Sequence, residues 1–170
     1  ADTGDGPRAY ALLRSDFNGI AKGSLVSYAV PASGTPGPVE AVFTPGATQA
    51  IENVDATGRA VYLSLLDNVA AKLVRLQREG GTWASREVPV PANSALGLIA
   101  TDEADTLYAN VVGFTEPSRL MKSVDGGAPV VLASAPAFFD GSKIEVSQRF
   151  ATSKDGTKVP YFVVRPKGAK

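Results

Sequence analysis

Residues 60–88, AVYLSLLDNVAAKLVRLQREGGTWASREV, contain three β-rich segments in close succession. These segments are 60–66, 72–77 and 83–88, and the last two are separated by the turn-forming stretch Glu79-Gly80-Gly81-Thr82. Glycine gives the backbone the freedom that a tight reversal of the chain requires. The stretch therefore predicts three antiparallel strands joined by short connections.

The same order of segments occurs twice more, within residues 9–43 and 106–132. Leu25, Leu73 and Leu120 are the first leucines in the middle segments of the three copies, so successive copies are 48 and 47 residues apart. Two further β-capable segments, 48–54 and 94–100, supply a fourth strand to each unit. A period of forty to fifty residues with four short strands is typical of β-propeller blades. The alternative is a β-sandwich in which the spacing is accidental.

The predicted fold is therefore all-β: a partial β-propeller of four-stranded antiparallel blades, followed by a β-hairpin. Roughly three blades occupy residues 1–134, a linker occupies 135–143, and the hairpin occupies 144–170. A second turn between strands of a blade is expected at Asp125-Gly126-Gly127. No segment combines a sustained helical period with capping residues, so almost no helix is expected.

The hairpin is predicted from Asp155-Gly156, which lies between two β-rich segments and suits a tight turn. A two-residue turn would oppose Phe150 to Tyr161, Thr152 to Val159 and Gln148 to Val163, with Phe162 and Val164 on the other face. The second strand is apolar on both faces, which predicts a covering layer on each side. Since an isolated hairpin is only marginally stable, we expect the chain to be part of a longer protein.

Composition excludes several classes of function. Seventeen basic and seventeen acidic residues give zero net charge, so there is no basic surface that would predict nucleic-acid binding. The absence of cysteine excludes disulfides and thiolate sites and leaves the cellular compartment undetermined. The absence of histidine means that this chain cannot build a Ser-His-Asp triad by itself. Its apolar runs are too short for a membrane-spanning helix, and residues 1–7 do not resemble a signal peptide.

A search for chemical motifs finds no G-x-S-x-G elbow, S-x-x-K pair, Walker loop or G-x-G-x-x-G, and no metal pattern of histidine or cysteine. We therefore predict no catalytic, cofactor-binding or metal-binding residue and no cofactor. Calcium ligands could be sought among acidic residues, but these are also ordinary turn residues, and the turn interpretation is favoured. The residues concerned are Asp2, Asp5, Asp102, Glu103 and Asp105.

Polar residues on or beside the predicted innermost strands could line a central channel, although strand ends have the same composition. They are Gln49, Glu52, Asn53, Asn93 and Ser94. The large apolar residues Trp83, Phe138 and Phe139 are expected to contribute to core packing rather than to a binding site.

The stretch 148–168, QRFATSKDGTKVPYFVVRPKG, resembles the prolyl oligopeptidase family at the return from its propeller into its α/β-hydrolase domain. The stretch 107–117, LYANVVGFTEP, is similar to the last-blade strand of that family with its aromatic-Thr-x-Pro turn. The resemblance covers most of the chain, specifically at the tail and diffusely in the blades. It implies that 1–134 are the last blades and that 144–170 begin the hydrolase domain.

The resemblance further implies a serine peptidase that cleaves short peptides after proline, with the propeller as a gate over the active site. The nucleophile, acid and base of the family would lie beyond Lys170, so the fragment is expected to be inactive. The expected partners are short proline-containing peptides, without nucleic acid or membrane. Uncovered blade faces and strand edges also predict self-association of the fragment. The alternative is a non-enzymatic propeller segment that binds peptides or proteins.

Overall fold

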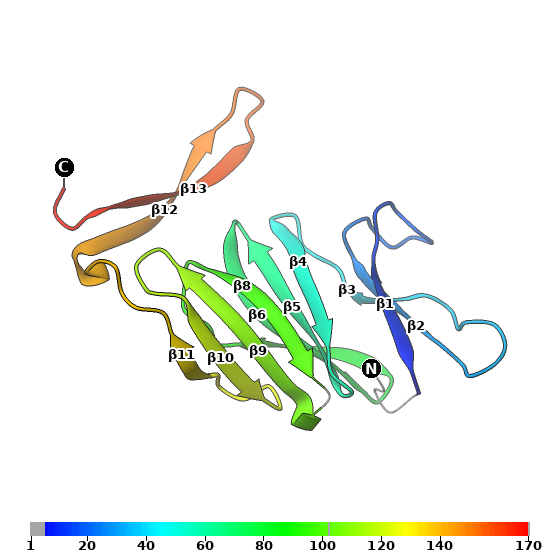
Figure 1. Cartoon of the computed structure of the whole chain (residues 1–170). Helices are drawn as coiled ribbons and strands as arrows, with labels where there is room; N and C mark the ends of the chain where they lie inside the picture. The colour runs from blue at the N-terminus through cyan, green and yellow to red at the C-terminus, as the bar shows by residue number, and fades with distance from the viewer. Residues whose placement is uncertain (1–5, 102, 170) are drawn as a thin grey trace.

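The computed structural model describes residues 6–101 and 103–169, and Figure 1 shows them as a nearly all-β chain. The first sheet contains β1 (Arg8–Leu12), β2 (Leu25–Ala29) and β3 (Glu40–Phe43). The second contains β4 (Gln49–Ala56), β5 (Ala60–Asp67), β6 (Ala70–Glu79) and β7 (Thr82–Val88). The third contains β8 (Ser94–Thr101), β9 (Thr106–Gly113), β10 (Arg119–Val124) and β11 (Val130–Ser134).

The chain ends in a separate two-stranded sheet, which stands apart from the three others in Figure 1. Its strands are β12 (Ile144–Thr152) and β13 (Lys158–Pro166). Helix in the described residues is limited to two three-residue 3-10 turns, η1 (Glu103–Asp105) and η2 (Gly141–Lys143). The predictions of an all-β fold, antiparallel sheets and almost no helix are confirmed. The sheets formed by residues 6–101 and 103–169 do not close into a ring.

Two turns between outer strands have the backbone that their sequences predict. Gly80 and Gly81 have φ values of 56° and 86°, and Asp125 and Gly126 have φ values of 49° and 62°. Positive φ at both central residues is typical of a type I′ turn, whose twist matches that of the two strands it joins. These turns therefore position β7 and β11 at the outer edges of their sheets.

The second sheet is buried on both faces because it lies between the other two. On β5, Tyr62 belongs to a core cluster shared with the third sheet, while Val61 and Leu63 belong to a cluster shared with the first. All three side chains are 0% exposed. The apolar run 60–66 is continuous because this strand contacts a layer on each side.

A buried ion pair joins the second and third sheets. Arg75 on β6 donates from Nη2 to Asp105 Oδ2 at 2.5 Å, and the two side chains are only 7% and 0% exposed. Asp105 also accepts a hydrogen bond from Thr57 Oγ1 at 2.5 Å and from the Tyr62 hydroxyl at 3.4 Å. Burial raises the pKa of Tyr62, so its hydroxyl stays neutral and remains a donor.

The terminal hairpin differs from its predicted register by one residue. Its turn has a three-residue loop in which Gly156 alone has a positive φ of 86°, and Ser153 closes the loop by donating to the Thr157 carbonyl. A three-residue loop with a left-handed glycine adds a bulge residue that a two-residue turn lacks. Phe150 therefore lies opposite Pro160, Thr152 opposite Lys158 and Gln148 opposite Phe162.

The expected covering layers of the hairpin are incomplete, although Phe162 on one face and Val163 on the other are partly buried. The Phe162 ring lies 5.2 Å from the ring of Phe114, at the end of β9. In contrast, Val159, Tyr161 and Val164 are 43% to 47% exposed. The described residues thus leave much of this apolar strand uncovered.

The expectation of core packing is confirmed for Trp83 and wrong for the two phenylalanines. Trp83 packs edge-on against Tyr10 at a ring distance of 6.1 Å, between the first two sheets. Phe138 and Phe139 are 91% and 58% exposed. They lie in the connection between β11 and η2 and line a cavity beside the turn after β9.

Candidate functional site

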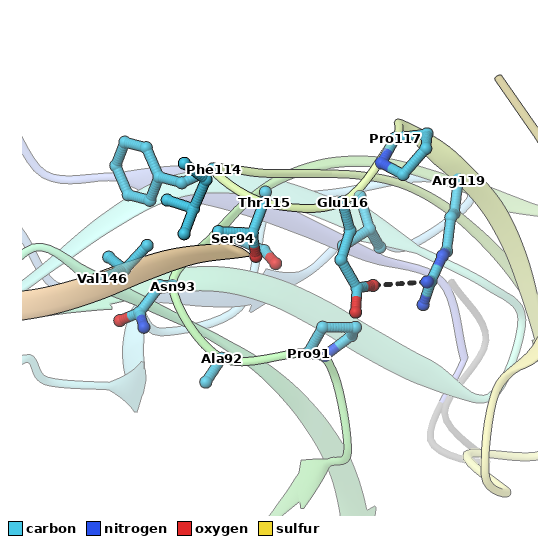
Figure 2. A pocket seen from close by; sticks show the side chains of 13 residues that line it. Pro91, Ala92, Asn93, Ser94, Phe114, Thr115, Glu116, Pro117, Arg119 and Val146 are labelled. Atoms are coloured by element: carbon cyan, nitrogen blue, oxygen red, sulfur yellow. Dashed lines mark ion pairs between the residues drawn. The ribbon is translucent and has the colours of Figure 1, made fainter. Parts of the chain in front are cut away.

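Three neighbouring cavities surround Phe114, where the third sheet, the connection 135–143 and the hairpin approach one another. The cavity in Figure 2 has a volume of about 220 Å³ and lies between the 91–94 connection, the turn after β9 and the start of β12. Its labelled lining residues are Pro91, Ala92, Asn93, Ser94, Phe114, Thr115, Glu116, Pro117, Arg119 and Val146. We call the region around Phe114 that contains these cavities the junction cleft.

The turn after β9 supplies one wall of the junction cleft. Pro117 fixes its own φ and disfavours the α conformation at Glu116, so the chain leaves the strand direction at this point. Glu116 forms an ion pair with Arg119 at the start of β10, drawn as a dashed line in Figure 2. The side chains of this pair are 51% and 31% exposed. Because both charges are partly solvated, the pair leaves this wall polar but electrically neutral.

A second cavity of about 430 Å³ lies on the other side of Phe114. Its walls are mainly apolar and come from Leu66, Val69, Ala95, Val112, Phe114 and Phe162. Asn93 and Ser94 contribute polar atoms to this cavity and also line the first one. Glu52 is its single ionisable lining residue in the described part of the chain. The two cavities share Asn93, Ser94, Gly113 and Phe114, and we call them together the groove.

The hairpin is held over this groove by a few specific contacts. Phe162 packs against Phe114, and the Gln148 side-chain amide donates a hydrogen bond to the carbonyl of Asn68 in the β5–β6 turn. The connection before the hairpin approaches the Thr115 backbone so closely that a Cβ added to Gly141 would lie 1.8 Å from the Thr115 carbonyl oxygen. The position of the hairpin therefore depends on Gly141 having no side chain.

The structure brings together three of the five polar residues that were considered for a channel. Glu52, Asn93 and Ser94 line the groove. Gln49 instead lines a different cavity near β1, and its side-chain amide donates to Asp67 at 3.3 Å. Asn53 lines none of the cavities described above. Three of the five residues therefore share one cavity beside the hairpin, and a central channel lined by them stays a prediction.

Sequence reasoning did not identify Phe114, Arg119 or Val69 as lining residues. Phe114 belongs to the aromatic-Thr-x-Pro stretch that carried the family resemblance, so a signal was present there. Val69 gave no signal, since a valine is not expected in a tight turn, yet its φ is 63°. These three residues lie near one another only because of the way the sheets and the hairpin pack together.

The acidic residues considered for calcium do not form a metal site among the residues described. No group of three or more potential ligands occurs in those residues. The Asp105 carboxylate already accepts hydrogen bonds from Arg75 and Thr57. Asp2, Asp5 and Asp102 lie outside the described residues, as does the side chain of Glu103.

The junction cleft has the chemistry of a binding surface. Ser94 and Thr115 carry hydroxyl groups, but within 6–101 and 103–169 neither hydroxyl is hydrogen-bonded to a base that could activate it as a nucleophile. The apolar walls can cover side chains of a ligand, and the amide and hydroxyl groups can pair with a peptide backbone.

None of the described residues forms a helix that could cross a membrane.

Two curated peptidases are similar to this chain in sequence. An uncharacterised peptidase of Sinorhizobium fredii is 35% identical over 96% of this chain, and one of Rickettsia prowazekii is 29% identical over 94%. The chain spans about a quarter of the length of these relatives, 24% and 23% respectively. No family model matches the chain.

Solved structures of peptidases are also similar to this chain. A post-proline cleaving enzyme from Rickettsia typhi superposes with a TM-score of 0.78 and 28% identity, covering 96% of this chain and 25% of that one. The chain is similar in sequence and fold to prolyl oligopeptidases along almost its whole length. Prolyl oligopeptidase B from Galerina marginata has a similar fold, with a TM-score of 0.69 and 18% identity over 86% of this chain and 21% of that one. The resemblance of the tail and blades to this family is therefore confirmed.

Proposed function

We propose that this chain is part of a serine-type prolyl oligopeptidase that hydrolyses short peptides after proline. Residues 1–134 would form roughly the last three propeller blades, 135–143 a linker, and 144–170 the first hairpin of an α/β-hydrolase domain. The observation that carries this proposal is the similarity to a post-proline cleaving enzyme over 96% of the chain. In the whole protein the blades would act as a gate over the active site.

The geometry of the junction cleft supports a role in admitting substrate. The groove lies between the third sheet and the hairpin, which is where a peptide would pass if the hairpin opens a catalytic domain. Its walls combine an aromatic pair with uncharged polar groups and one carboxylate, Glu52, which suits a short extended peptide better than a highly charged ligand.

The proposed reaction forms an acyl-enzyme at a serine that a histidine activates, and an oxyanion hole stabilises the tetrahedral intermediate. This chain has no histidine, so the proton transfers would depend on residues elsewhere in the whole protein. The contribution of the chain itself would be to bind peptides in the groove and to exclude folded proteins.

The test compares the 170-residue chain with the longer protein that contains it. We expect the longer protein to release the chromophore from a Gly-Pro chromogenic substrate, and the chain alone to give no turnover above buffer. Turnover by the chain alone would contradict the assignment of catalysis to other residues. An inactive longer protein that still binds peptides would favour the non-enzymatic interaction module.

The chain is also expected to associate with itself, because apolar side chains of β11 are uncovered. Val130, Val131 and Leu132 are 49% to 58% exposed, and Phe138 nearby is 91% exposed. Apolar surface of this kind promotes association in water. Sedimentation velocity should show a weight-average mass that rises with concentration, and a single monomeric species at high concentration would contradict the expectation.

A further inference from the structure

The apolar cavity beside Phe114 is lined by a carboxylate, Glu52, that has no partner among the described residues. Glu52 is the extra residue of a β-bulge on β4, because Ile51 pairs with Leu65 and Asn53 with the adjacent Ser64. Bulges turn a side chain away from its regular direction and are frequent beside binding sites. Glu52 is exposed and makes no ion pair or hydrogen bond with any other described residue.

The wall next to this carboxylate contains a strained residue. Asn68 and Val69 form the two-residue turn between β5 and β6, with φ values of 49° and 63°. A β-branched residue is a rare outlier in this region, where an Asn-Gly pair would be unstrained. Val69 lines the cavity and is 40% exposed, so it does not gain the burial that would normally offset strain. Strained residues of this kind cluster at ligand-binding positions.

We infer that this cavity binds the amino-terminal residue of a short peptide, with its ammonium group at Glu52 and its apolar side chain against Val69, Val112 and Phe162. The inference rests on the proposed function, since it assigns a substrate end to the same groove. A cation and an apolar group are both needed to match the walls, and a first residue with an apolar side chain carries both on one Cα. Asn93 and Ser94 then face the peptide backbone.

The volume of the cavity agrees with such an occupant. At about 430 Å³ it falls within the range of small-ligand sites, and its lining is predominantly apolar with few polar groups. A lysine or arginine side chain of a ligand would also satisfy Glu52 but would leave the apolar wall without a partner. Acetylation of the terminal amine of the peptide distinguishes the two cases, because it removes the charge of the amino terminus and leaves a basic side chain unchanged.

The first arm of the test measures binding to the 170-residue chain by NMR titration, without any reading of hydrolysis. We expect Leu-Gly-Pro-amide to bind about fivefold more tightly than its N-acetylated form, the ratio typical of one partly solvated ion pair. Glu52→Gln should remove this difference. The control Glu87→Gln, on the outer strand β7, should keep it. Equal affinity of the two peptides for the wild-type chain overturns the inference.

The second arm separates a binding role of Val69 from a structural one. Val69→Gly creates the preferred Asn-Gly turn, so the midpoint of thermal unfolding should stay the same or rise. The same change should weaken binding of Leu-Gly-Pro-amide and leave that of Gly-Gly-Pro-amide unchanged. Unchanged affinity for the leucine peptide would overturn the inference. If these arms fail while the longer protein still cleaves after proline, the proposed function stands and only this subsite is rejected.

Discussion

Replacing Asp105 with Asn is expected to lower the free energy of unfolding by about 3–5 kcal/mol, because it leaves a buried guanidinium without its main counter-charge. Asp105 is 0% exposed and Arg75 is 7% exposed, so water cannot replace the lost partner. The substitution isolates the charge, since Asn keeps the size of Asp and accepts the positive φ of 47° at this position. Urea denaturation followed by circular dichroism measures the effect.

The matched control is Asp125→Asn, which removes the other carboxylate that contacts Arg75. Its Oδ1 lies 3.3 Å from the same Nη2, and its φ of 49° is nearly the same. Because the Asp125 side chain is 72% exposed, the expected loss is below about 1 kcal/mol. Equal losses for the two variants would show that burial does not decide the value of this ion pair.

A double variant distinguishes an unpaired charge from a simple loss of contacts. Arg75→Met together with Asp105→Asn removes both charges, and the chain should then recover part of the stability lost in Asp105→Asn alone. The explanation would be contradicted if the double variant lost more unfolding free energy than the two single variants lose together.

Replacing Gly141 with Ala is expected to displace the terminal hairpin and to cost about 1–3 kcal/mol of stability, as overpacking usually does. The new Cβ would lie 1.8 Å from the Thr115 carbonyl oxygen and 2.8 Å from its carbon. Both are backbone atoms and cannot rotate away, so the connection 135–143 has to move. Since the hairpin follows this connection directly, the contact between Phe114 and Phe162 should weaken.

The control for this change is Gly97→Ala, on β8. Its added Cβ would meet nothing nearer than the Asn110 Cβ at 3.9 Å, so its stability should change by less than about 1 kcal/mol. Nuclear Overhauser effects between the rings of Phe114 and Phe162 report the position of the hairpin in both variants. Retention of these effects in Gly141→Ala, at unchanged stability, would show that the close approach does not hold the hairpin in place.

Local patterns in the sequence were sufficient to predict the sheets. Strands such as 60–66 and 106–112 were located from β-forming residues between turn signals, and the turns predicted at Gly80-Gly81 and Asp125-Gly126 are present, with positive φ values. These features depend on residues close together in the chain. The register of the hairpin was wrong by one residue because Asp-Gly fits both a two-residue turn and the three-residue loop that the structure has.

The candidate site was predictable only in part. Glu52, Asn93 and Ser94 were considered because they lie on or beside inner strands, but their neighbours Phe114 and Phe162 come from elements far apart in the sequence. The strain at Val69 follows from the length of the β5–β6 connection, which forces the left-handed conformation on a residue that disfavours it.

The amino-acid sequence by itself determined the all-β class, the repeated units and the absence of a histidine base, because these follow from residue type and short-range spacing. The tertiary structure decided which polar groups face one groove and that Asp105 forms an ion pair with Arg75. It also decided that the residue at position 141 must lack a side chain. Each of these depends on distances between residues that are remote in the chain. Burial and close approach set their energies, and both exist only once the sheets and the hairpin have packed.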